Sequence, residues 1–352
     1  MTRPISSADF AEQVQGRLDG FLAGQADELS ELGEQLTPML SVAADAVRGG
    51  KRLRPTFCYW GWRAAGGDPD DGRILTAAAA LELLHASALV HDDVIDDSDT
   101  RRGMPAAHRA FGAMHVEQRW PGRESQFGLG AAILLGDLLL AWSDQMLRSS
   151  GLVTDAALPY FNLMRNEVVA GQFLDLVAQN NGAMSVPQAM RVLRYKSAKY
   201  TIERPLHLGA ALAGADQTLI NGLTSYGLPL GEAFQLRDDL LGVYGDPAVT
   251  GKPAGDDLRE GKRTMLVALA AEHADPEQEE VLHKHFGRAG LDDDGVAALR
   301  AVLDDTGARD RVEKLIDQLA AAAAAALEQA PVDPEVRTAL DDLAGAVIRR
   351  DA

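Results

Sequence analysis

An apolar run from Leu81 to Val90 leads directly into four aspartates within six residues, at positions 92, 93, 96 and 97. Like charges this close repel one another on a helix surface, so we expect a cation among them. Asp92 and Asp96 are four residues apart, and a helix therefore places both on one face. Two carboxylates at this spacing can share Mg²⁺, which prefers oxygen ligands and commonly bridges to phosphate. Arg101 and Arg102 follow and supply charge that pairs with phosphate oxygens.

A second acidic pair lies far downstream, where Gln235, Asp238 and Asp239 have the spacing i, i+3 and i+4. A helix places these three side chains on one face as well. We expect the two acidic helices to face each other across a cavity, where they could clamp one diphosphate through several metal ions.

The composition favours an all-α protein. Of the 352 residues, 46% are hydrophobic and 24% are charged, which is typical of a soluble globular chain. Aromatic residues make up only 5%, and no strand-like alternation continues beyond a few residues, so helices are favoured over a β-sandwich or barrel. We predict a single all-α domain over residues 1–352, with a motif-bearing core at about 45–265 and peripheral helices at 266–352.

Charge and targeting signals narrow the possible partners. The net charge of −18 disfavours nucleic-acid binding, because the molecule as a whole repels a phosphate backbone. The one cysteine, Cys58, cannot form an intramolecular disulfide, which fits a reducing compartment. Residues 1–25 show no signal peptide. The most apolar stretch, Leu129 to Trp142, is short and contains Asp137, so we expect no membrane span and a cytoplasmic location.

Helical periodicity and breaking residues place the helices and loops. The segment from Gly245 to Arg263 is rich in Gly, Pro and Lys, lacks apolar periodicity and is long enough to act as a lid. Pro205 is expected to kink or break its helix. The predicted helices are 8–40 (as one or two), 55–65, 71–97 (with Asp71 as its N-cap), 131–149, 157–180, 187–213 and 225–244, and further loops are predicted at 101–105 and 118–126.

Several single residues allow two interpretations. His85 precedes Asp92 by seven residues and lies on nearly the same helix face, either as a core histidine or as a ligand. Lys51 and Arg54 follow two glycines, and this segment is either a surface loop or a phosphate cradle. The sequence has no glycine-rich nucleotide loop, no clustered Cys/His metal site and no Gly-x-Ser-x-Gly elbow, so a Mg²⁺–diphosphate site is favoured.

Taken together, these motifs make the chain similar to trans-isoprenyl diphosphate synthases of the polyprenyl synthetase family, such as farnesyl and geranylgeranyl diphosphate synthases. The resemblance covers about residues 45–265. Its motifs follow the family's order at 49–55 (GGKRLRP), 82–85 (ELLH), 91–96 (HDDVID), 101–103 (RRG), 136–137 (GD), 196–197 (KS), 234–239 (FQLRDD), 251–253 (GKP) and 257–262 (DLREGK).

The resemblance implies an orthogonal helical bundle around a central cavity (the isoprenoid synthase fold), normally a homodimer, with about three Mg²⁺ ions per active site. It implies that isopentenyl diphosphate binds to Lys51, Arg54, His85 and Arg102. It implies that the allylic diphosphate binds to Arg101, Lys196, Ser197, Gln235, Lys252 and Lys262. The implied metal ligands are Asp92, Asp96 and Asp238, supported by Asp93 and Asp239, and these five residues with Arg101 and Lys196 form the catalytic set.

Two positions depart from the family pattern. The second acidic motif normally reads Asp-Asp-x-x-Asp, but its last position here is Gly242, which removes one carboxylate. Asp246, one turn further, is a candidate replacement. Ser197 replaces the usual Thr and keeps the hydroxyl group.

The implied reaction ionises the allylic diphosphate, adds isopentenyl diphosphate to the cation and loses a proton. The growing tail is expected to run along the Asp92 helix, where Ser87 and Ala88 are small and do not block it. Leu139 or Trp142 could form the floor of the tunnel. We therefore predict geranylgeranyl diphosphate (C20) as the product, with farnesyl (C15) or longer chains as alternatives. Replacing Ser87 and Ala88 by Phe should shorten the product.

Two other functions share parts of this pattern. A class I terpene cyclase uses the same fold and ionisation but needs no isopentenyl site, so Lys51, Arg54 and His85 argue against it. A non-catalytic partner subunit of another synthase is mildly favoured by Gly242, whereas the two complete basic sites argue against it.

Overall fold

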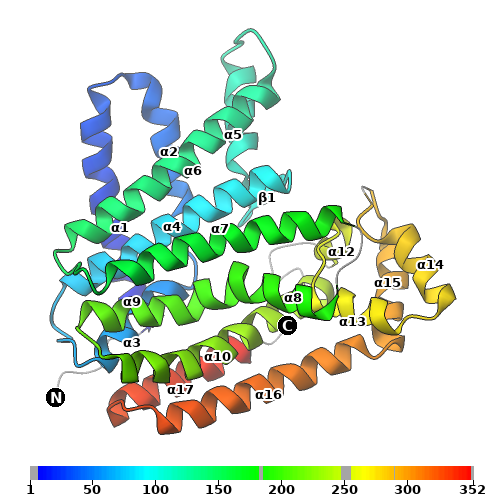
Figure 1. Cartoon of the computed structure of the whole chain (residues 1–352). Helices are drawn as coiled ribbons and strands as arrows, with labels where there is room; N and C mark the ends of the chain where they lie inside the picture. The colour runs from blue at the N-terminus through cyan, green and yellow to red at the C-terminus, as the bar shows by residue number, and fades with distance from the viewer. Residues whose placement is uncertain (1–6, 182–184, 247–254, 289, 350–352) are drawn as a thin grey trace. The chain divides into compact units, whose positions relative to one another are not determined.

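The computed structural model of the chain describes residues 7–181, 185–246, 255–288 and 290–349. Contacts divide the chain into two compact units. Unit 1 comprises Met1–Trp62 and Gly66–Thr154, and unit 2 comprises Arg63–Ala65 and Asp155–Ala352. Figure 1 shows that both units are built from helices. The all-α prediction is confirmed, because within the described ranges the strands amount to a single pair of two residues each.

Unit 1 is organised around α4 (Arg73–Ile95), which packs chiefly against α6 (Glu124–Ser149). Residues 77–81 of α4 are all completely buried, as expected for a helix that is apolar on every side. The N-cap is Gly72 and not the predicted Asp71, so the helix begins one residue later than predicted, and it ends two residues earlier, before the C-cap Asp96. The other helices of the unit are α1 (Ser7–Ser30), η1 (Glu34–Leu36), α2 (Thr37–Ala46), most of α3 (Leu53–Ala64) and α5 (Ala107–Glu117).

The loop predicted at 101–105 forms a small β-hairpin. Strands β1 (Thr100–Arg101) and β2 (Met104–Pro105) pair antiparallel, with Arg101 opposite Met104. Arg102 and Gly103 are the two connecting residues, and both have positive φ, at 53° and 76°. A two-residue turn with positive φ at both positions matches the twist of the strands and favours glycine. The hairpin thus holds Arg101 and Arg102 on a short, defined support.

Unit 2 is organised around α10 (Gln217–Tyr244), which packs against the helical segment η2 (Leu193–Glu203) and against α16 (Ala308–Gln329). Its hydrophobic core joins Leu236 and Leu240 of α10 to Leu266, Leu299 and Ile316. The remaining elements are α7 (Leu158–Asn180), α8 (Val186–Val192), α9 (Arg204–Leu212), α12 (Asp256–Glu260), α13 (Met265–His273), α14 (Pro276–His285), α15 (Asp293–Asp305) and α17 (Pro334–Ile348). The predicted lid, 245–263, contains α12, and its residues 247–254 lie outside the described part of the chain.

The helix predicted at 187–213 contains a π-helical stretch. Helix α8 continues into η2, which is π-helical over 11 residues, and then into α9. The backbone N–H of Arg204 donates to the carbonyl of Lys199, five residues earlier. Pro205 has no N–H and lies in the first turn of α9, where that helix needs no donor from it. The predicted irregularity at Pro205 is therefore a change of helix type.

Two helices, α4 and α6, are long and apolar enough to cross a bilayer by length and composition alone. The sequence-based expectation that no segment reaches this length was too strict. In α4, 72% of the apolar window is buried inside the protein, as in the core helix of a globular domain. The corresponding share in α6 is 33%, and α6 therefore presents an exposed apolar face.

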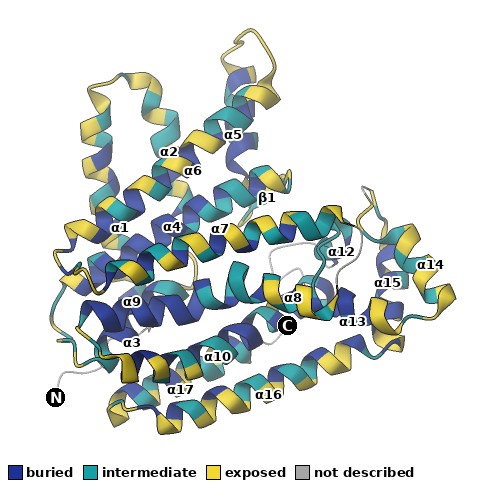
Figure 2. Cartoon of the chain, in the orientation of Figure 1, coloured by how far each residue is buried: buried dark blue, intermediate teal, exposed yellow. Residues whose placement is uncertain are grey.

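Helix α9 is buried along its whole length, as Figure 2 shows. It includes His207, whose Nδ1 lies 3.1 Å from the Arg204 Nη1 and whose Nε2 lies 3.0 Å from the Thr224 hydroxyl. Because an arginine can only donate, Nδ1 is the acceptor and the proton of the neutral ring sits on Nε2. Burial first, and then the charges of Arg204 and Lys199, lower the pKa of His207 to about 3.

The unfolding free energy should consequently fall on acidification. Below pH ~6.5 the unfolded chain protonates this imidazole while the folded chain does not, so stability is lost as the pH decreases. Between pH 7.5 and 5, His207 should account for a loss of about 2 kcal/mol, and His207→Gln should remove that share. Urea unfolding followed by circular dichroism at both pH values measures it, with the exposed His273→Gln as control. An unchanged pH dependence in His207→Gln would contradict the assignment.

Candidate active site

The acidic end of α4 carries Asp92 and Asp96 on one turn. Asp96 caps the helix, and its backbone N–H donates to the Asp92 carbonyl at 2.8 Å. Asp93 points into the protein, with a side chain that is 3% exposed compared with 19% for Asp92. The Arg101 Nε donates to the Asp93 Oδ1 at 2.9 Å, and the Arg101 Nη2 lies 3.6 Å from the Asp92 Oδ2. The helix therefore separates the adjacent carboxylates, and Asp93 holds Arg101 beside Asp92.

A group of cations surrounds His85 in unit 1. Desolvation first, and then the charges of Arg54 and Arg102, hold the pKa of His85 well below its usual value. The imidazole is therefore neutral at pH 7, and its surroundings are electropositive. An anion with several oxygens would relieve the repulsion among these cations and find hydrogen-bond donors in the same place. The predicted isopentenyl diphosphate residues Arg54, His85 and Arg102 belong to this group, and their role stays a prediction.

Gly50 lets the segment that carries Lys51 approach Arg102. Its φ is +89°, and a Cβ at this position would lie 3.3 Å from the Arg102 Nη2. The Arg102 Nη1 also donates to the Arg48 carbonyl at 3.1 Å. Lys51 itself is exposed. The predicted phosphate cradle thus lies next to the hairpin that carries Arg102.

Arg52 lies in the same motif as Lys51 and Arg54, at 49–55, but it has a structural role. It is buried, forms an ion pair with buried Glu82 and donates to the Val47 carbonyl at 2.8 Å. A buried ion pair that is fully hydrogen-bonded fixes its surroundings, and removing one partner leaves a costly unpaired charge. The pair therefore anchors the loop that carries Lys51 to α4.

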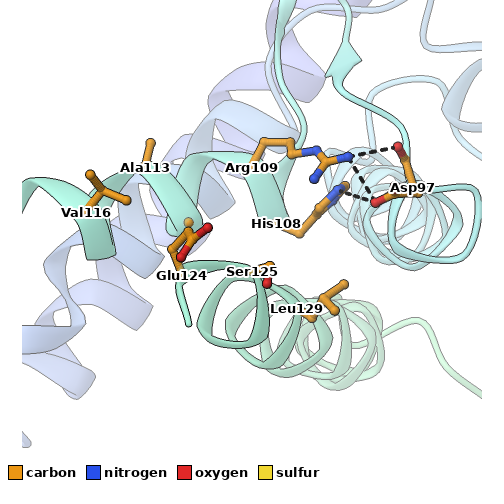
Figure 3. A pocket seen from close by; sticks show the side chains of 9 residues that line it. Asp97, His108, Arg109, Ala113, Val116, Glu124, Ser125 and Leu129 are labelled. Carbon is orange, nitrogen blue, oxygen red and sulfur yellow. Dashed lines mark hydrogen bonds and ion pairs between the residues drawn. The ribbon is translucent and has the colours of Figure 1, made fainter. Parts of the chain in front are cut away.

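A cavity of about 230 Å³ lies between α5 and α6, and Figure 3 shows it with Arg109 and His108 directed towards Asp97. Arg109 donates to the Asp97 Oδ1 at 3.0 Å, and its Nε lies 2.9 Å from the Asp99 Oδ1. These contacts tie α5 to the segment between α4 and the hairpin. None of the predicted site residues lines the cavity.

The acidic face of α10 contains an exposed Asp238 and a buried Asp239. The Gln235 Nε2 donates to the Asp239 Oδ1 at 2.8 Å, as their i, i+4 spacing allows. Burial is the main cause that raises the pKa of Asp239 well above its usual value, and the charges of Asp257 and Asp238 raise it further. Asp257 therefore adds a carboxylate to the predicted set Gln235, Asp238 and Asp239, although it was not among the predicted site residues.

Asp257 lies directly against Gly242. A Cβ at Gly242 would be 2.0 Å from the Asp257 Oδ2, far closer than any real contact. The Gly255 N–H also donates to the Gly242 carbonyl at 3.2 Å, which joins the segment before α12 to α10. Asp246 does not take this place on the helix, because α10 ends at Tyr244 and the backbone becomes extended at Gly245. The proposed replacement by Asp246 is therefore not supported by the helix geometry.

Two of the predicted basic site residues of unit 2, Lys196 and Lys262, have acidic partners. The Lys196 Nζ, on η2, donates to the Asp175 Oδ2 of α7 at 2.7 Å. Lys262 lies 3.4 Å from the Asp257 Oδ1 and 2.5 Å from the Glu260 Oε2. Ser197 is half-buried on η2, next to Lys196. Lys252 lies outside the described residues. The sequence alone does not distinguish Asp175 from the other residues of its helix. Asp257, in contrast, lies in the family motif at 257–262.

The donor atoms fit a hard divalent cation bound together with phosphate. In the parts of the chain that the structure describes, no three His, Cys, Asp or Glu side chains are arranged to hold a metal by themselves. Mg²⁺ commonly uses only one or two carboxylates and completes its shell with water and substrate phosphate. Asp92 with Asp96, and Asp238 with Asp257, supply such pairs, and the mutual repulsion around Asp239 is what a cation would relieve.

The residues predicted to set chain length differ in burial. Ser87, Leu139 and Trp142 are buried, and Ala88 is half-buried. Trp142 packs edge-on against Phe21, with ring centroids 6.3 Å apart. Leu139 and Trp142 belong to α6, the main packing partner of α4. Their role in chain length stays a prediction.

Comparisons with known proteins identify the family of the chain. The polyprenyl synthetase family model matches residues 37–303. Geranylfarnesyl diphosphate synthase of Aeropyrum pernix is 33% identical over 86% of this chain and 91% of its own. Octaprenyl diphosphate synthase of Escherichia coli K12 is 34% identical over 86% of this chain and 87% of its own length. One similar solved structure is a crystal structure of geranylgeranyl pyrophosphate synthase from Corynebacterium glutamicum, complexed with isoprenyl diphosphate and magnesium. It matches with 42% sequence identity and a TM-score of 0.93, and the match covers 97% of this chain and 99% of that chain. The chain therefore belongs to the polyprenyl synthetase family of trans-prenyltransferases.

Proposed function

We propose that the protein condenses isopentenyl diphosphate with an allylic diphosphate in a Mg²⁺-dependent reaction. One observation carries this proposal: helix α4 bears both a carboxylate pair, Asp92 and Asp96, and, two turns earlier, His85 within its group of cations. The carboxylates suit a metal-bound diphosphate that ionises. The cations suit a second diphosphate that stays intact. A cyclase, which has one substrate, would need only the first of these groups.

The chain's own residues support ionisation followed by condensation. Bound Mg²⁺ would neutralise the allylic diphosphate and turn it into a good leaving group. Arg101, held by Asp93, and Lys196, held by Asp175, add fixed positive charge for the same purpose. Arg54, His85 and Arg102 would hold isopentenyl diphosphate so that its double bond attacks the allylic cation. A proton then leaves the condensed product, and the departing diphosphate is the acceptor that the family resemblance implies.

Asp257 supplies a carboxylate beside Gly242, the position at which the family motif has its third Asp. Its Oδ2 lies where a side chain at position 242 would start, so it supplies an acid to the same face of α10. Asp257 itself belongs to the family motif at 257–262, so it is a carboxylate that this chain keeps while the third Asp of the α10 motif is absent. Gln235, Lys252 and Lys262 are the other residues assigned to the allylic diphosphate, and the family resemblance implies about three Mg²⁺ ions per active site.

We propose geranylgeranyl diphosphate as the product, supported by the small residues Ser87 and Ala88 on α4 and by the named Corynebacterium glutamicum structure. The tail would pass Ala88 on its way towards Leu139 or Trp142. Ala88→Phe should therefore shift the main product to C15 or shorter, because a phenyl ring fills the path. Ser87 is buried, so a Phe there would overpack the core, and the single Ala88 variant is the better test. Chromatography of dephosphorylated products measures the shift, and an unchanged product would remove Ala88 from the tunnel.

A direct assay tests the function. The purified chain is incubated with Mg²⁺, labelled isopentenyl diphosphate and, separately, dimethylallyl, geranyl or farnesyl diphosphate. Incorporation of label into a longer prenyl diphosphate is the expected result. Cyclic hydrocarbons formed without isopentenyl diphosphate would indicate a terpene cyclase. No turnover with any primer, together with stimulation of another synthase, would indicate a regulatory subunit.

We further propose a homodimer in the cytoplasm. On α6, Ile133 and Leu134 are exposed, and on α7, Val169 and Phe173 are exposed, the last three by more than 60% each. Apolar side chains this exposed on long helices are typical of subunit contacts. Leu134→Glu should therefore shift the chain towards monomer in size-exclusion chromatography with light scattering, whereas exposed Leu32→Glu should not. Buried Cys58, whose pKa is raised to about 12 by burial, is compatible with a reducing compartment.

A further inference from the structure

The segment η2 has an uncommon geometry for its length. Most π-helical segments are single-turn bulges, and they are frequent at functional sites. This one extends over 11 residues and carries Lys196 and Ser197, which the proposed function assigns to the allylic diphosphate. The backbone of a π-helix is wider than that of an α-helix because its hydrogen bonds close a larger ring. Neighbouring helices must therefore leave additional room beside it.

Glycines on both flanking helices leave this room. On α7, a Cβ at Gly171 would lie 2.3 Å from the Lys196 backbone N and 2.6 Å from the Tyr195 carbonyl carbon. On α10, a Cβ at Gly231 would lie 2.5 Å from the Ala198 carbonyl oxygen. All these neighbours are backbone atoms, which cannot rotate away as a flexible side chain can. Any larger residue must displace the π-helical backbone at or beside Lys196.

A third glycine makes a milder contact at the end of the segment. A Cβ at Gly227 would lie 2.9 Å from the Leu206 Cδ1 and 3.2 Å from the Glu203 Cα. The nearer atom is the tip of a flexible side chain, so a methyl group is easier to accommodate here. The three glycines thus differ in how strongly they restrict η2, in the order 171, 231, 227.

Acidic residues of the same two helices bind the cations of η2. Asp175 of α7 accepts from Lys196 at 2.7 Å, and Glu167 of α7 accepts from Lys199 at 3.2 Å. Glu232 of α10 accepts from the Arg194 Nε at 2.6 Å. These distances depend on the position of the η2 backbone, so a shift at Gly171 or Gly231 would lengthen them.

We propose that Gly171 and Gly231 are positioning residues for the allylic diphosphate site. They admit the wide π-helical backbone between α7 and α10 and so determine where Lys196 and Ser197 present their polar atoms. The inference rests on the proposed function, because that function assigns these two residues to the substrate.

The test compares Gly171→Ala and Gly231→Ala in the full chain with Gly20→Ala on α1, where a Cβ would meet nothing within 4 Å. The KM for the allylic diphosphate should rise about tenfold or more, the loss expected when one hydrogen bond to a charged group is misplaced. The KM for isopentenyl diphosphate and both KM values of the Gly20 variant should stay within about twofold of wild type. A parallel change in both KM values, or none, would overturn the proposal.

Two further variants separate positioning from a loss of folding. Gly227→Ala should give a smaller rise in the same KM, and it remains informative if the tighter variants do not fold. In an Asp175→Asn background, where Lys196 has already lost its partner, Gly171→Ala should add less than it does alone. Full additivity would show that the glycine acts elsewhere.

The wild-type assay reports on the proposed function separately. If the wild-type chain does not condense the two diphosphates, the proposed function fails. Calorimetry with inorganic pyrophosphate and Mg²⁺ then still tests the role of the glycines. The substitutions should weaken pyrophosphate binding, most strongly in Gly171→Ala, less in Gly231→Ala and least in Gly227→Ala. Equal affinities in all four chains would overturn the inference by itself.

Discussion

Replacing Asp92 by Asn is expected to lower kcat by about 10²–10³-fold, the usual effect of removing one charge-stabilising group from an active site. The variant keeps the size and shape of the side chain, so α4 should fold unchanged. The amide is a poorer ligand for Mg²⁺ and leaves the Arg101 charge beside it less balanced. Steady-state rates with saturating isopentenyl and allylic diphosphates measure the loss.

A matched control uses a carboxylate away from the site. Asp144 on α6 forms an i, i+4 ion pair with Arg148, and pairs of this kind contribute only about 0.3–0.5 kcal/mol. Asp144→Asn should retain wild-type kcat within about twofold. If Asp92→Asn retains turnover as Asp144→Asn does, the α4 carboxylates do not take part in ionisation and the proposed mechanism is wrong.

Gly242→Asp, which restores the family motif, is expected to impair the enzyme. A Cβ at position 242 would lie 2.0 Å from the Asp257 Oδ2, so the new side chain must displace that carboxylate or the α12 segment. Overpacking of this kind typically costs about 1–3 kcal/mol, and two acids would then compete for one place. We expect kcat to fall about tenfold or more and the Mg²⁺ concentration for half-maximal rate to increase.

Swapping the two residues separates crowding from charge. Gly242→Asp combined with Asp257→Gly moves the carboxylate to the family's position and removes the clash, so it should recover part of the lost activity. Gly242→Ala should be impaired without any change of charge. Binding of Mn²⁺ in the presence of pyrophosphate, followed by electron paramagnetic resonance, gives a readout independent of turnover. A gain of activity in Gly242→Asp alone would show that Asp257 does not make a carboxylate at position 242 unnecessary.

Helix positions were predictable where periodicity is strong, and less so where packing decides. Helix α7 was predicted at 157–180 and is observed at Leu158–Asn180. Helix α10 begins eight residues before its predicted start at Ser225 and continues through Pro229, because core packing on α16 and η2 supports it. Helix α6 similarly begins at Glu124, inside the predicted loop. The hairpin at Arg102 was missed because each of its strands has only two residues, too few for any periodicity.

The charge pattern of α4 and α10, the helical class and the family motifs follow from the sequence alone, because spacings of three and four residues determine which side chains share a helix face. Only the tertiary structure revealed that Asp257 stands against Gly242, that Asp93 and Asp175 hold Arg101 and Lys196, and that glycines of α7 and α10 accommodate a π-helix. Each of these features joins residues on separate elements, so it depends on how backbones pack and not on any local repeat.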